Sequence, residues 1–160
     1  MKRDKKFSFL NSEVSTISWV TAYDYPIAYC AEMAGIDMIL VGDSGAMVQH
    51  GHESTLPITM LSMITMCQSV RRGASSTFIV GDMPFGSYEA SDEQAVKHAV
   101  DFLKAGNCDA VKLEGGIRIS SRIRAIAQAG ITVIGHIGLT PQSSTQLGGY
   151  KVQGKTLNNF

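Results

Sequence analysis

Short apolar runs alternate with longer segments of helical periodicity along most of the chain. Four of these runs each follow a glycine that closes the preceding helical segment, at 38–43, 78–82, 110–114 and 132–136. They are short and rich in apolar residues, which is typical of strands buried on both faces of a parallel sheet. A β-rich run at 17–22 gives a fifth predicted strand.

The helical segments between these runs have recognisable starts and ends. Ser91 and Gln94 have the spacing of a capping box, and Gly106 stands at a typical stop position after that segment. Pro26 begins a shorter helical pattern that Gly35 ends. Alternating strands and amphipathic helices predict an α/β fold with right-handed crossovers, either an open doubly wound sheet or a (β/α) barrel. The chain has no GxGxxG or Walker motif after a predicted strand, which disfavours a nucleotide-binding sheet.

An ionisable residue ends each of the four later strands: Asp43, Asp82, Glu114 and His136. Because parallel strands point the same way, these side chains should meet at the carboxyl edge of the sheet, where ligands bind in such folds. An aspartate after a glycine also commonly begins a turn or caps a helix, so either aspartate alone would be a weak indication. Taken together, the four residues predict a functional site at this edge.

The strand at 110–114 carries opposite charges on one of its faces. Side chains alternate along a strand, so Lys112 and Glu114 share one face while Val111 and Leu113 share the other. Burying a lysine and a glutamate is costly unless they are paired, hydrogen-bonded or bound to a ligand. A structural ion pair is the simple interpretation, and the position of the two residues at the predicted site favours a role in binding.

Three of these residues, Asp43, Asp82 and Glu114, offer hard oxygen ligands. With one histidine and no cysteine nearby, this set suits Mg²⁺ better than zinc or iron. Lys112 and His136 beside such an ion would suit a substrate carboxylate, or a carbonyl oxygen on which negative charge develops. The residue types therefore suggest metal-assisted enolate chemistry on an α-keto acid, without naming the substrate.

Composition narrows the class of protein. The chain has 160 residues, a formal net charge of zero and 44% hydrophobic residues, which indicates one globular domain without a general attraction for nucleic acid or acidic membranes. Its three cysteines are far apart and form no CxxC motif, so free thiols in a reducing compartment fit best. Neither a signal-peptide apolar region nor a run long enough for a membrane span is present. We therefore expect a cytoplasmic protein with neither nucleic-acid nor membrane partners.

A series of ordered motifs resembles the ketopantoate hydroxymethyltransferase (3-methyl-2-oxobutanoate hydroxymethyltransferase) family. The similarity runs from about Thr21 to Thr156 and includes the segments 21–24, 40–44, 51–57, 81–85, 111–116, 135–143 and 148–154. The resemblance implies a (β/α)8 TIM barrel that binds Mg²⁺. It also implies transfer of a hydroxymethyl group from 5,10-methylenetetrahydrofolate to 3-methyl-2-oxobutanoate, giving 2-dehydropantoate in pantothenate biosynthesis.

Roles for individual residues follow from the matching positions. The resemblance implies that Asp43 and Asp82 hold the metal, with Glu114 as a further ligand or just outside the coordination sphere. It implies that the keto acid is bound by residues at five positions: Asp43, Ser44, Asp82, Lys112 and His136. Because the family tends to form large homo-oligomers, we expect a homo-oligomer whose small-molecule partners are the keto acid and the folate.

The length of the chain departs from the family pattern. We expect an N-terminal arm at 1–16 and a single barrel domain at 17–160, truncated at its C-terminal side to about five βα units. A complete barrel of this type takes about 250 residues. In the family, the carboxylate that removes the C3 proton lies in the part that has no counterpart here. We therefore expect the catalytic base beyond residue 160 and assign that role to no residue of this chain.

Other interpretations remain open. The chain could be a non-catalytic truncated product that self-assembles through an exposed sheet edge or complements a partner segment. It could be a Mg²⁺-dependent C–C lyase of the phosphoenolpyruvate mutase/isocitrate lyase type, which is similar to the family in fold and metal chemistry. It could also be a complete short enzyme with His52 or Glu53 as a substitute base. A separate metal site at 50–53 is disfavoured because its histidines lack the i, i+4 spacing of a helical site.

Overall fold

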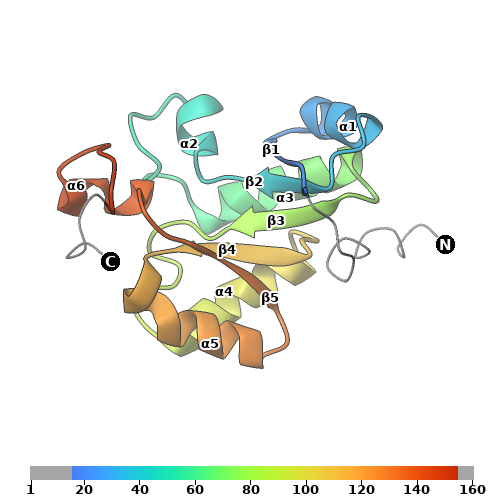
Figure 1. Ribbon diagram of the computed structural model, residues 1–160. Coiled ribbons are helices and arrows are strands. Elements are labelled where there is room, and N and C mark those ends of the chain that lie inside the picture. The colour runs from blue at the N-terminus through green and yellow to red at the C-terminus, as the bar shows by residue number, and fades with distance from the viewer. Residues whose placement is uncertain (1–15, 155–160) are drawn as a thin grey trace.

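The computed structural model describes residues 16–154 of the chain, which form one five-stranded parallel sheet with helices between the strands (Figure 1). The strands are β1 (Trp19–Thr21), β2 (Met38–Val41), β3 (Phe78–Asp82), β4 (Ala110–Glu114) and β5 (Thr132–His136). The α-helices are α1 (Tyr25–Met33), α2 (Gly45–Val48), α3 (Met60–Gly73), α4 (Asp92–Lys104), α5 (Ser120–Gln128) and α6 (Ser144–Leu147). Two short 3-10 helices, η2 (Gly116–Ile119) and η3 (Pro141–Ser143), precede α5 and α6.

The order of the strands decides between the two predicted architectures. Each strand pairs in parallel with the next one in sequence, so the order is β1-β2-β3-β4-β5. A doubly wound sheet reverses its strand order at a switch point, whereas a barrel adds its strands in sequence. Helices α3 and α4 lie behind the sheet, and the opposite face is turned toward the viewer (Figure 1). The arrangement is that of consecutive units of a (β/α) barrel, as predicted.

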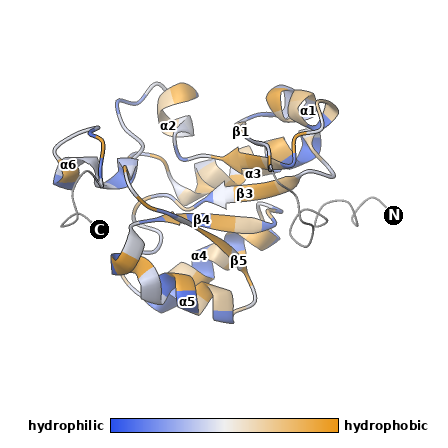
Figure 2. Cartoon of the chain, in the orientation of Figure 1, coloured by the Kyte–Doolittle hydropathy of each residue, from blue (hydrophilic) through white to orange (hydrophobic). Residues whose placement is uncertain are grey.

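Each face of the sheet carries its own apolar cluster. The larger cluster joins the helices to alternate strand residues, among them Ile39, Ile79 and Val111. The smaller cluster lies on the opposite face and consists of Met38, Phe78, Val80 and Ala110, with Leu40 and Ile134 packed against it. The strands are accordingly among the most hydrophobic parts of the chain (Figure 2). Because side chains alternate, Lys112 and Glu114 continue the smaller cluster toward the carboxyl edge.

The predicted elements agree with the structure except near the ends of the first two strands. The strands predicted at 78–82, 110–114 and 132–136 have these bounds in the structure. The first strand begins at Trp19 rather than Ile17, and β2 ends at Val41, so the following Gly-Asp pair lies outside the ladder. These are positions where the hydrogen-bonded ladder, rather than apolar character, defines the end of the element.

The predicted capping box at the start of α4 is only half formed. The Oγ of Ser91 accepts a hydrogen bond from the backbone N–H of Gln94 at 3.1 Å. The Oε1 of Gln94 accepts from the N–H of Ala90 at 3.2 Å, and not from Ser91 as a complete capping box requires. The helix is still capped, because the bond from Gln94 to Ser91 satisfies a backbone donor of its first turn.

The two outer strands of the sheet are less covered than the three central strands. All five residues of β3 and of β4 are buried, whereas β1 is exposed throughout and β5 is exposed or half-buried. Edges of this kind offer unpaired backbone groups to a further strand.

The cysteines are free thiols, as predicted, and Cys67 and Cys108 are buried. Within residues 16–154, no helix combines the length and apolar character that crossing a membrane requires.

Candidate functional site

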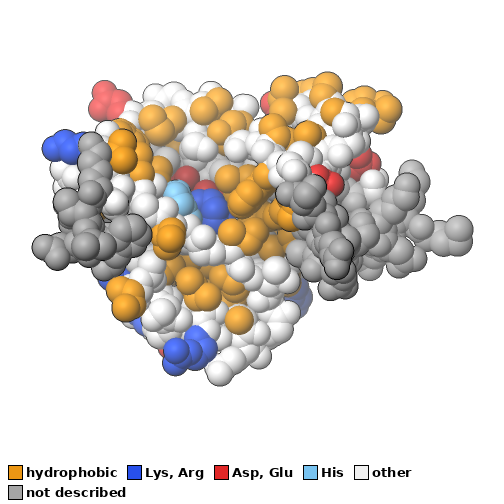
Figure 3. Space-filling model, viewed as in Figure 1, with side chains coloured by type: hydrophobic (Ala, Val, Ile, Leu, Met, Phe, Trp, Pro, Cys, Tyr) orange, Lys and Arg blue, Asp and Glu red, His pale blue; other side chains and the backbone are white. Residues whose placement is uncertain are grey.

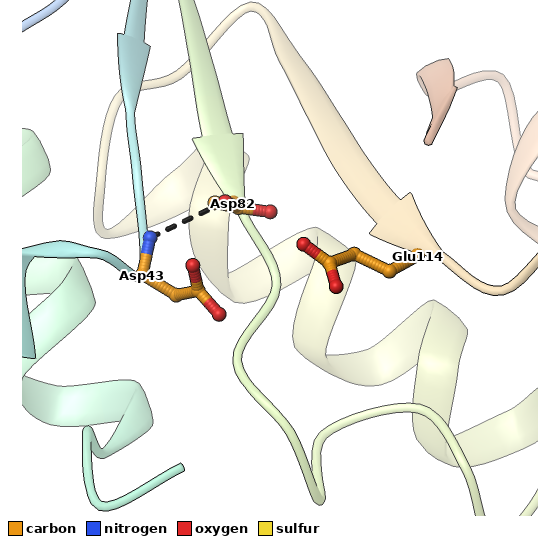
Figure 4. Close-up of side chains that lie close together, drawn as sticks. All are labelled: Asp43, Asp82 and Glu114. Atoms are coloured by element: carbon orange, nitrogen blue, oxygen red, sulfur yellow. Dashed lines mark hydrogen bonds between the residues drawn. The ribbon is translucent and has the colours of Figure 1, made fainter. Parts of the chain in front are cut away.

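The register of the central strands brings the predicted site residues together. Asp82 on β3 is the register partner of Lys112 on β4, and Glu114 on β4 is the partner of His136 on β5. Asp43 follows β2, and its backbone N–H donates to Oδ2 of Asp82 at 3.2 Å. Figure 4 shows the carboxylates of Asp43, Asp82 and Glu114 converging from three different strands. The prediction that these residues meet at the carboxyl edge of the sheet is therefore confirmed for their positions.

Three buried carboxylates form the centre of the site. One oxygen each from Asp43, Asp82 and Glu114 can be chosen so that all three atoms lie within 4.8 Å of one another. Oxygen ligands at this spacing are the donor set that Mg²⁺ and similar hard cations prefer. The residues present thus fit a divalent metal ion.

The ammonium of Lys112 is the cation that already lies in this cluster. Its Nζ is 2.8 Å from Oδ1 of Asp82 and 3.3 Å from Oε1 of Glu114. Three carboxylates against one ammonium leave a formal charge of −2 when the histidine is neutral. A bound divalent cation would balance that charge. On the face shown in Figure 3, basic, acidic and imidazole side chains gather beside a hydrophobic area at the centre of the molecule.

The pKa values of the two aspartates are raised, mainly because both carboxyl groups are buried. Burial raises the pKa of Asp82 to about 7, although the charge of Lys112 acts in the opposite direction. Burial is also the largest cause that raises the pKa of Asp43, and the negative charge of Glu114 adds to it. Both shifts mean that the ionised forms are costly here without a further cation.

Glu114 and Lys112 are held in their charged forms. Burial acts to raise the pKa of Glu114, but the hydrogen bond from His136 and the charge of Lys112 outweigh it, so the pKa is lowered. Burial acts to lower the pKa of Lys112, but the neighbouring Asp82 and Glu114 outweigh it, so that pKa is raised. The Nδ1 of His136 lies 3.0 Å from Oε1 of Glu114, which orients the ring. Glu114 and Lys112 therefore stay charged at neutral pH.

Gln142, in the turn after β5, was not selected from the sequence as a site residue and lies at the centre of this network. Its Nε2 donates to Oδ2 of Asp43 and to the backbone oxygen of Met83, both at 2.9 Å. Its backbone N–H donates to Oε2 of Glu114 at 3.2 Å. The hydroxyl of Tyr88 donates to Oε1 of the same amide. No strand-end pattern marks either residue, although Gln142 belongs to the motif at 135–143.

A comparison with known protein families identifies the family to which the chain belongs. The model of the family described as ketopantoate hydroxymethyltransferase matches residues 4–159. The chain belongs to this family. A 3-methyl-2-oxobutanoate hydroxymethyltransferase of Alkaliphilus metalliredigens is 61% identical over 143 residues, which are 89% of this chain and 51% of that protein. A mitochondrial enzyme of the same name from Arabidopsis thaliana is 55% identical over 88% of this chain and 41% of its own length. The chain spans about half the length of the curated relatives it matches, or less.

Solved structures show the fold of this ketopantoate hydroxymethyltransferase family member independently. A phosphoenolpyruvate phosphomutase from Streptomyces platensis subsp. rosaceus superposes with a TM-score of 0.67 at 17% identity, over 81% of this chain and 52% of that one. A phosphonopyruvate hydrolase solved with oxalate and Mg²⁺ gives a TM-score of 0.66 at 14% identity, over 84% and 52% of the two chains. At these identities the likeness concerns the fold alone. It agrees with the prediction that the fold is similar to that of phosphoenolpyruvate mutase.

Ser44 lies next to the carboxylate cluster. Within residues 16–154, its side chain makes no hydrogen bond to the three carboxylates. It directly follows Asp43 in the chain and is half-buried at the start of α2. Its Oγ is 2.9 Å from the hydroxyl of Tyr23. The structure thus places Ser44 next to the site, and its predicted contact with the keto acid remains a prediction.

The two histidines of the loop after α2 are exposed, whereas the carboxylates of the cluster are buried. His50, His52 and Glu53 are exposed and follow α2, and the rings of His50 and His52 stack with their centroids 6.2 Å apart. Among the described residues, the acidic group with metal-ligand geometry is Asp43, Asp82 and Glu114, and it includes none of these three. A separate metal site at 50–53 therefore gains no support.

Proposed function

We propose that this chain carries the metal-binding and keto-acid-binding part of a ketopantoate hydroxymethyltransferase. The reaction would transfer a hydroxymethyl group from 5,10-methylenetetrahydrofolate to 3-methyl-2-oxobutanoate and give 2-dehydropantoate through an enolate of the keto acid. The observation that carries the proposal is the cluster of Asp43, Asp82 and Glu114 at the carboxyl edge of the sheet, in which the ammonium of Lys112 contacts Asp82 and Glu114. Family membership supplies the substrate class.

Asp43 and Asp82 would hold Mg²⁺, with Glu114 as a third ligand or just outside the coordination sphere. When bound there, Mg²⁺ would act as a Lewis acid toward the keto oxygen and make the neighbouring C3–H more acidic. Asp82 and Glu114 are the last residues of two adjacent strands, so the sheet sets their separation, and Asp43 follows the neighbouring strand β2. Ligands carried by strands are well ordered before the ion arrives.

Lys112 would bind the keto acid directly. Its ammonium is buried and stays protonated, because Asp82 and Glu114 raise its pKa. A fixed positive charge in a poorly solvated site stabilises the negative charge that develops on the keto oxygen when the C3 proton leaves. Asp82 would contact the keto acid from the neighbouring strand.

His136 and Ser44 would orient the keto acid. Because Nδ1 of His136 is engaged with Glu114, its other ring nitrogen, Nε2, would face the substrate. Ser44 follows Asp43 in the chain, and its hydroxyl would donate a hydrogen bond to a substrate oxygen. Both residues would give direction to the bound keto acid through hydrogen bonds.

The remaining parts of the reaction are assigned to groups outside these residues. We propose that the carboxylate that removes the C3 proton is supplied from beyond residue 160. The folate site is not assigned to residues of this chain. We further propose that residues 17–160 belong to a single barrel domain, truncated at its C-terminal side to about five βα units, and that the protein acts as a homo-oligomer.

Calorimetric titration of 3-methyl-2-oxobutanoate in the presence of Mg²⁺ tests the proposed site. Asp43→Ala and Asp82→Ala should each abolish the Mg²⁺-dependent heat, because each removes a ligand atom from the cluster. Asp101→Ala is the matched control: it lies near the C-terminal end of α4, which returns the chain to the opposite edge of the sheet. Binding in both site variants that matches the wild-type chain would overturn the assignment.

A further inference from the structure

The pair Tyr88 and Gln142 supports one oxygen of Asp43 without neutralising its charge. We propose that they are positioning residues: Tyr88 fixes the orientation of the Gln142 amide, and the amide in turn holds the Asp43 carboxylate ready for a cation. The inference rests on the proposed function, because it takes Asp43 to be part of a cation site.

The surroundings of the Gln142 amide allow one orientation. Its NH2 group has two hydrogens, and they are used by Oδ2 of Asp43 and the backbone oxygen of Met83, each 2.9 Å from Nε2. Its carbonyl oxygen accepts from the hydroxyl of Tyr88. A flipped amide would place its oxygen against two acceptors, the carboxylate of Asp43 and the backbone oxygen of Met83, and would lose both hydrogen bonds. The observed orientation satisfies every one of these groups, so a flip is strongly disfavoured.

Tyr88 is well suited to fix the amide because it is itself held firmly. Its side chain is buried, and burial raises the pKa of its hydroxyl well above the usual range, so it remains a donor. The hydroxyl also accepts from the backbone N–H of Glu114 at 3.3 Å. The backbone oxygen of Tyr88 accepts from Nε of Arg122 on α5 at 3.2 Å. The phenol therefore has a fixed place from which to orient Gln142.

Asp43 needs this support more than the other two carboxylates. It lies after the last residue of β2, outside the sheet ladder, whereas Asp82 and Glu114 are strand residues. The ammonium of Lys112 lies against Asp82 and Glu114. The group that contacts Asp43 is instead a neutral amide, which orients the carboxylate but leaves its negative charge for an incoming cation. A lysine or arginine in that place would compete with the metal.

The contacts of Gln142 can be separated by substitution. The side-chain amide contacts Asp43, while the backbone N–H contacts Glu114. A change of the side chain therefore removes the support of Asp43 and leaves the backbone bond to Glu114 available. Gln142→Leu removes the amide with little change in size, and Tyr88→Phe removes only the hydroxyl that orients it.

Titration with Mn²⁺, followed by electron paramagnetic resonance, tests the inference on the full chain. Gln142→Leu should weaken Mn²⁺ binding by about 10- to 100-fold, the range expected when a hydrogen-bond partner of a metal ligand is lost. Tyr88→Phe should weaken it by a smaller factor. Because Tyr88 acts mainly through Gln142, and its contact with the backbone of Glu114 is long at 3.3 Å, Tyr88→Phe should have a smaller effect in the Gln142→Leu chain than in the wild-type chain. Gln146→Leu, four residues along, is the matched control and should bind as the wild-type chain does.

Two outcomes would overturn the inference. One is wild-type Mn²⁺ affinity in Tyr88→Phe or in Gln142→Leu. The other is a double variant in which the two effects multiply, because independent effects would show that Tyr88 does not act through Gln142. Circular dichroism on each variant identifies any loss of folding, and the conservative Tyr88→Phe then serves as the deciding variant.

A measurement without metal separates this inference from the proposed function. The ¹³C resonance of the Asp43 carboxyl in the metal-free chain should move in the same direction in Tyr88→Phe and in Gln142→Leu, and stay in place in Gln146→Leu. If it moves as described while the wild-type chain binds no Mn²⁺, the positioning stands and the proposed metal function fails. If it does not move, the positioning fails, whatever the Mn²⁺ result.

Discussion

The ammonium of Lys112 lies 2.8 Å from Oδ1 of Asp82, its register partner on the neighbouring strand. Both side chains are buried, and the contact to Asp82 is shorter than the 3.3 Å contact to Glu114 on the same strand. Lys112 thus contacts two of the three carboxylates in the cluster and partly balances their negative charge.

Lys112→Met should separate keto-acid binding from metal binding. We expect the affinity for 3-methyl-2-oxobutanoate in Mg²⁺ to fall at least about tenfold, because hydrogen bonds to charged groups contribute roughly 1.5–3 kcal/mol. Mn²⁺ affinity should be unchanged or higher, because an ammonium beside the carboxylates opposes a second cation. Calorimetry and Mn²⁺ titration measure the two affinities. Lys104→Met, at the exposed end of α4, is the matched control.

A parallel loss of both affinities in Lys112→Met would contradict this prediction. It would mean that Lys112 maintains the arrangement of the carboxylates and does not bind the keto acid itself.

The raised pKa of Asp82 predicts the pH dependence of stability in the metal-free chain. Its pKa of about 7 lies above the usual 3.8, so between these values the native state holds a proton that the unfolded chain has released. The free energy of unfolding should therefore decrease as the pH rises from about 4 to 7, by at most about 1.4 kcal/mol per pH unit for this proton. Glu114 acts in the opposite sense, with its lowered pKa, but only below its usual 4.5.

Asp82→Asn should make this dependence shallower and leave the part that comes from the raised pKa of Asp43, whereas Asp101→Asn should not change it. Urea unfolding at several pH values measures it, and saturating Mg²⁺ should flatten it too, because a bound cation favours the ionised carboxylate. An unchanged slope in Asp82→Asn would show that another group titrates in this range.

The glycine before Asp82 should tolerate no side chain. A Cβ built on Gly81 would overlap the ring of Phe102, a residue of α4 that is fully buried. Gly81→Ala should lower the free energy of unfolding by about 1–3 kcal/mol, the usual cost of overpacking a core. Gly135, the residue before His136, is the matched control: its Cβ would meet only Ile123 Cδ1 at 3.7 Å, so Gly135→Ala should cost little. Equal costs in the two variants, measured by urea unfolding, would refute this account of the packing.

Deuterium exchange at C3 of 3-methyl-2-oxobutanoate tests where the base lies. In Mg²⁺, the chain should not speed the exchange above the rate with metal alone, because the proposed base is outside residues 1–160. NMR follows the loss of the C3 proton. Faster exchange that His52→Ala or Glu53→Ala abolishes, and that His50→Ala does not, would establish a substitute base on the loop after α2.

The pattern of apolar and polar residues within short segments was sufficient to predict most of the fold and the residues at the strand ends. Apolar runs after glycine-closed helices located the strands, and the alternation of side chains put Lys112 and Glu114 on one face. Parallel direction then required the terminal residues of these strands to share an edge. These conclusions need only the period of the strand and the handedness of the crossover, which a sequence carries within each short segment.

The tertiary structure alone decided which groups contact one another in the site. The sequential strand order selected a barrel over a doubly wound sheet, and the register made Asp82 the nearest partner of Lys112. Gln142 meets Asp43 across 99 residues and Tyr88 across 54, at positions that no local periodicity marks. Contacts of this kind depend on how the turn after β5 packs over the ends of the neighbouring strands. That packing is settled by the burial and hydrogen bonding of the whole domain, which the pattern of a single segment does not contain.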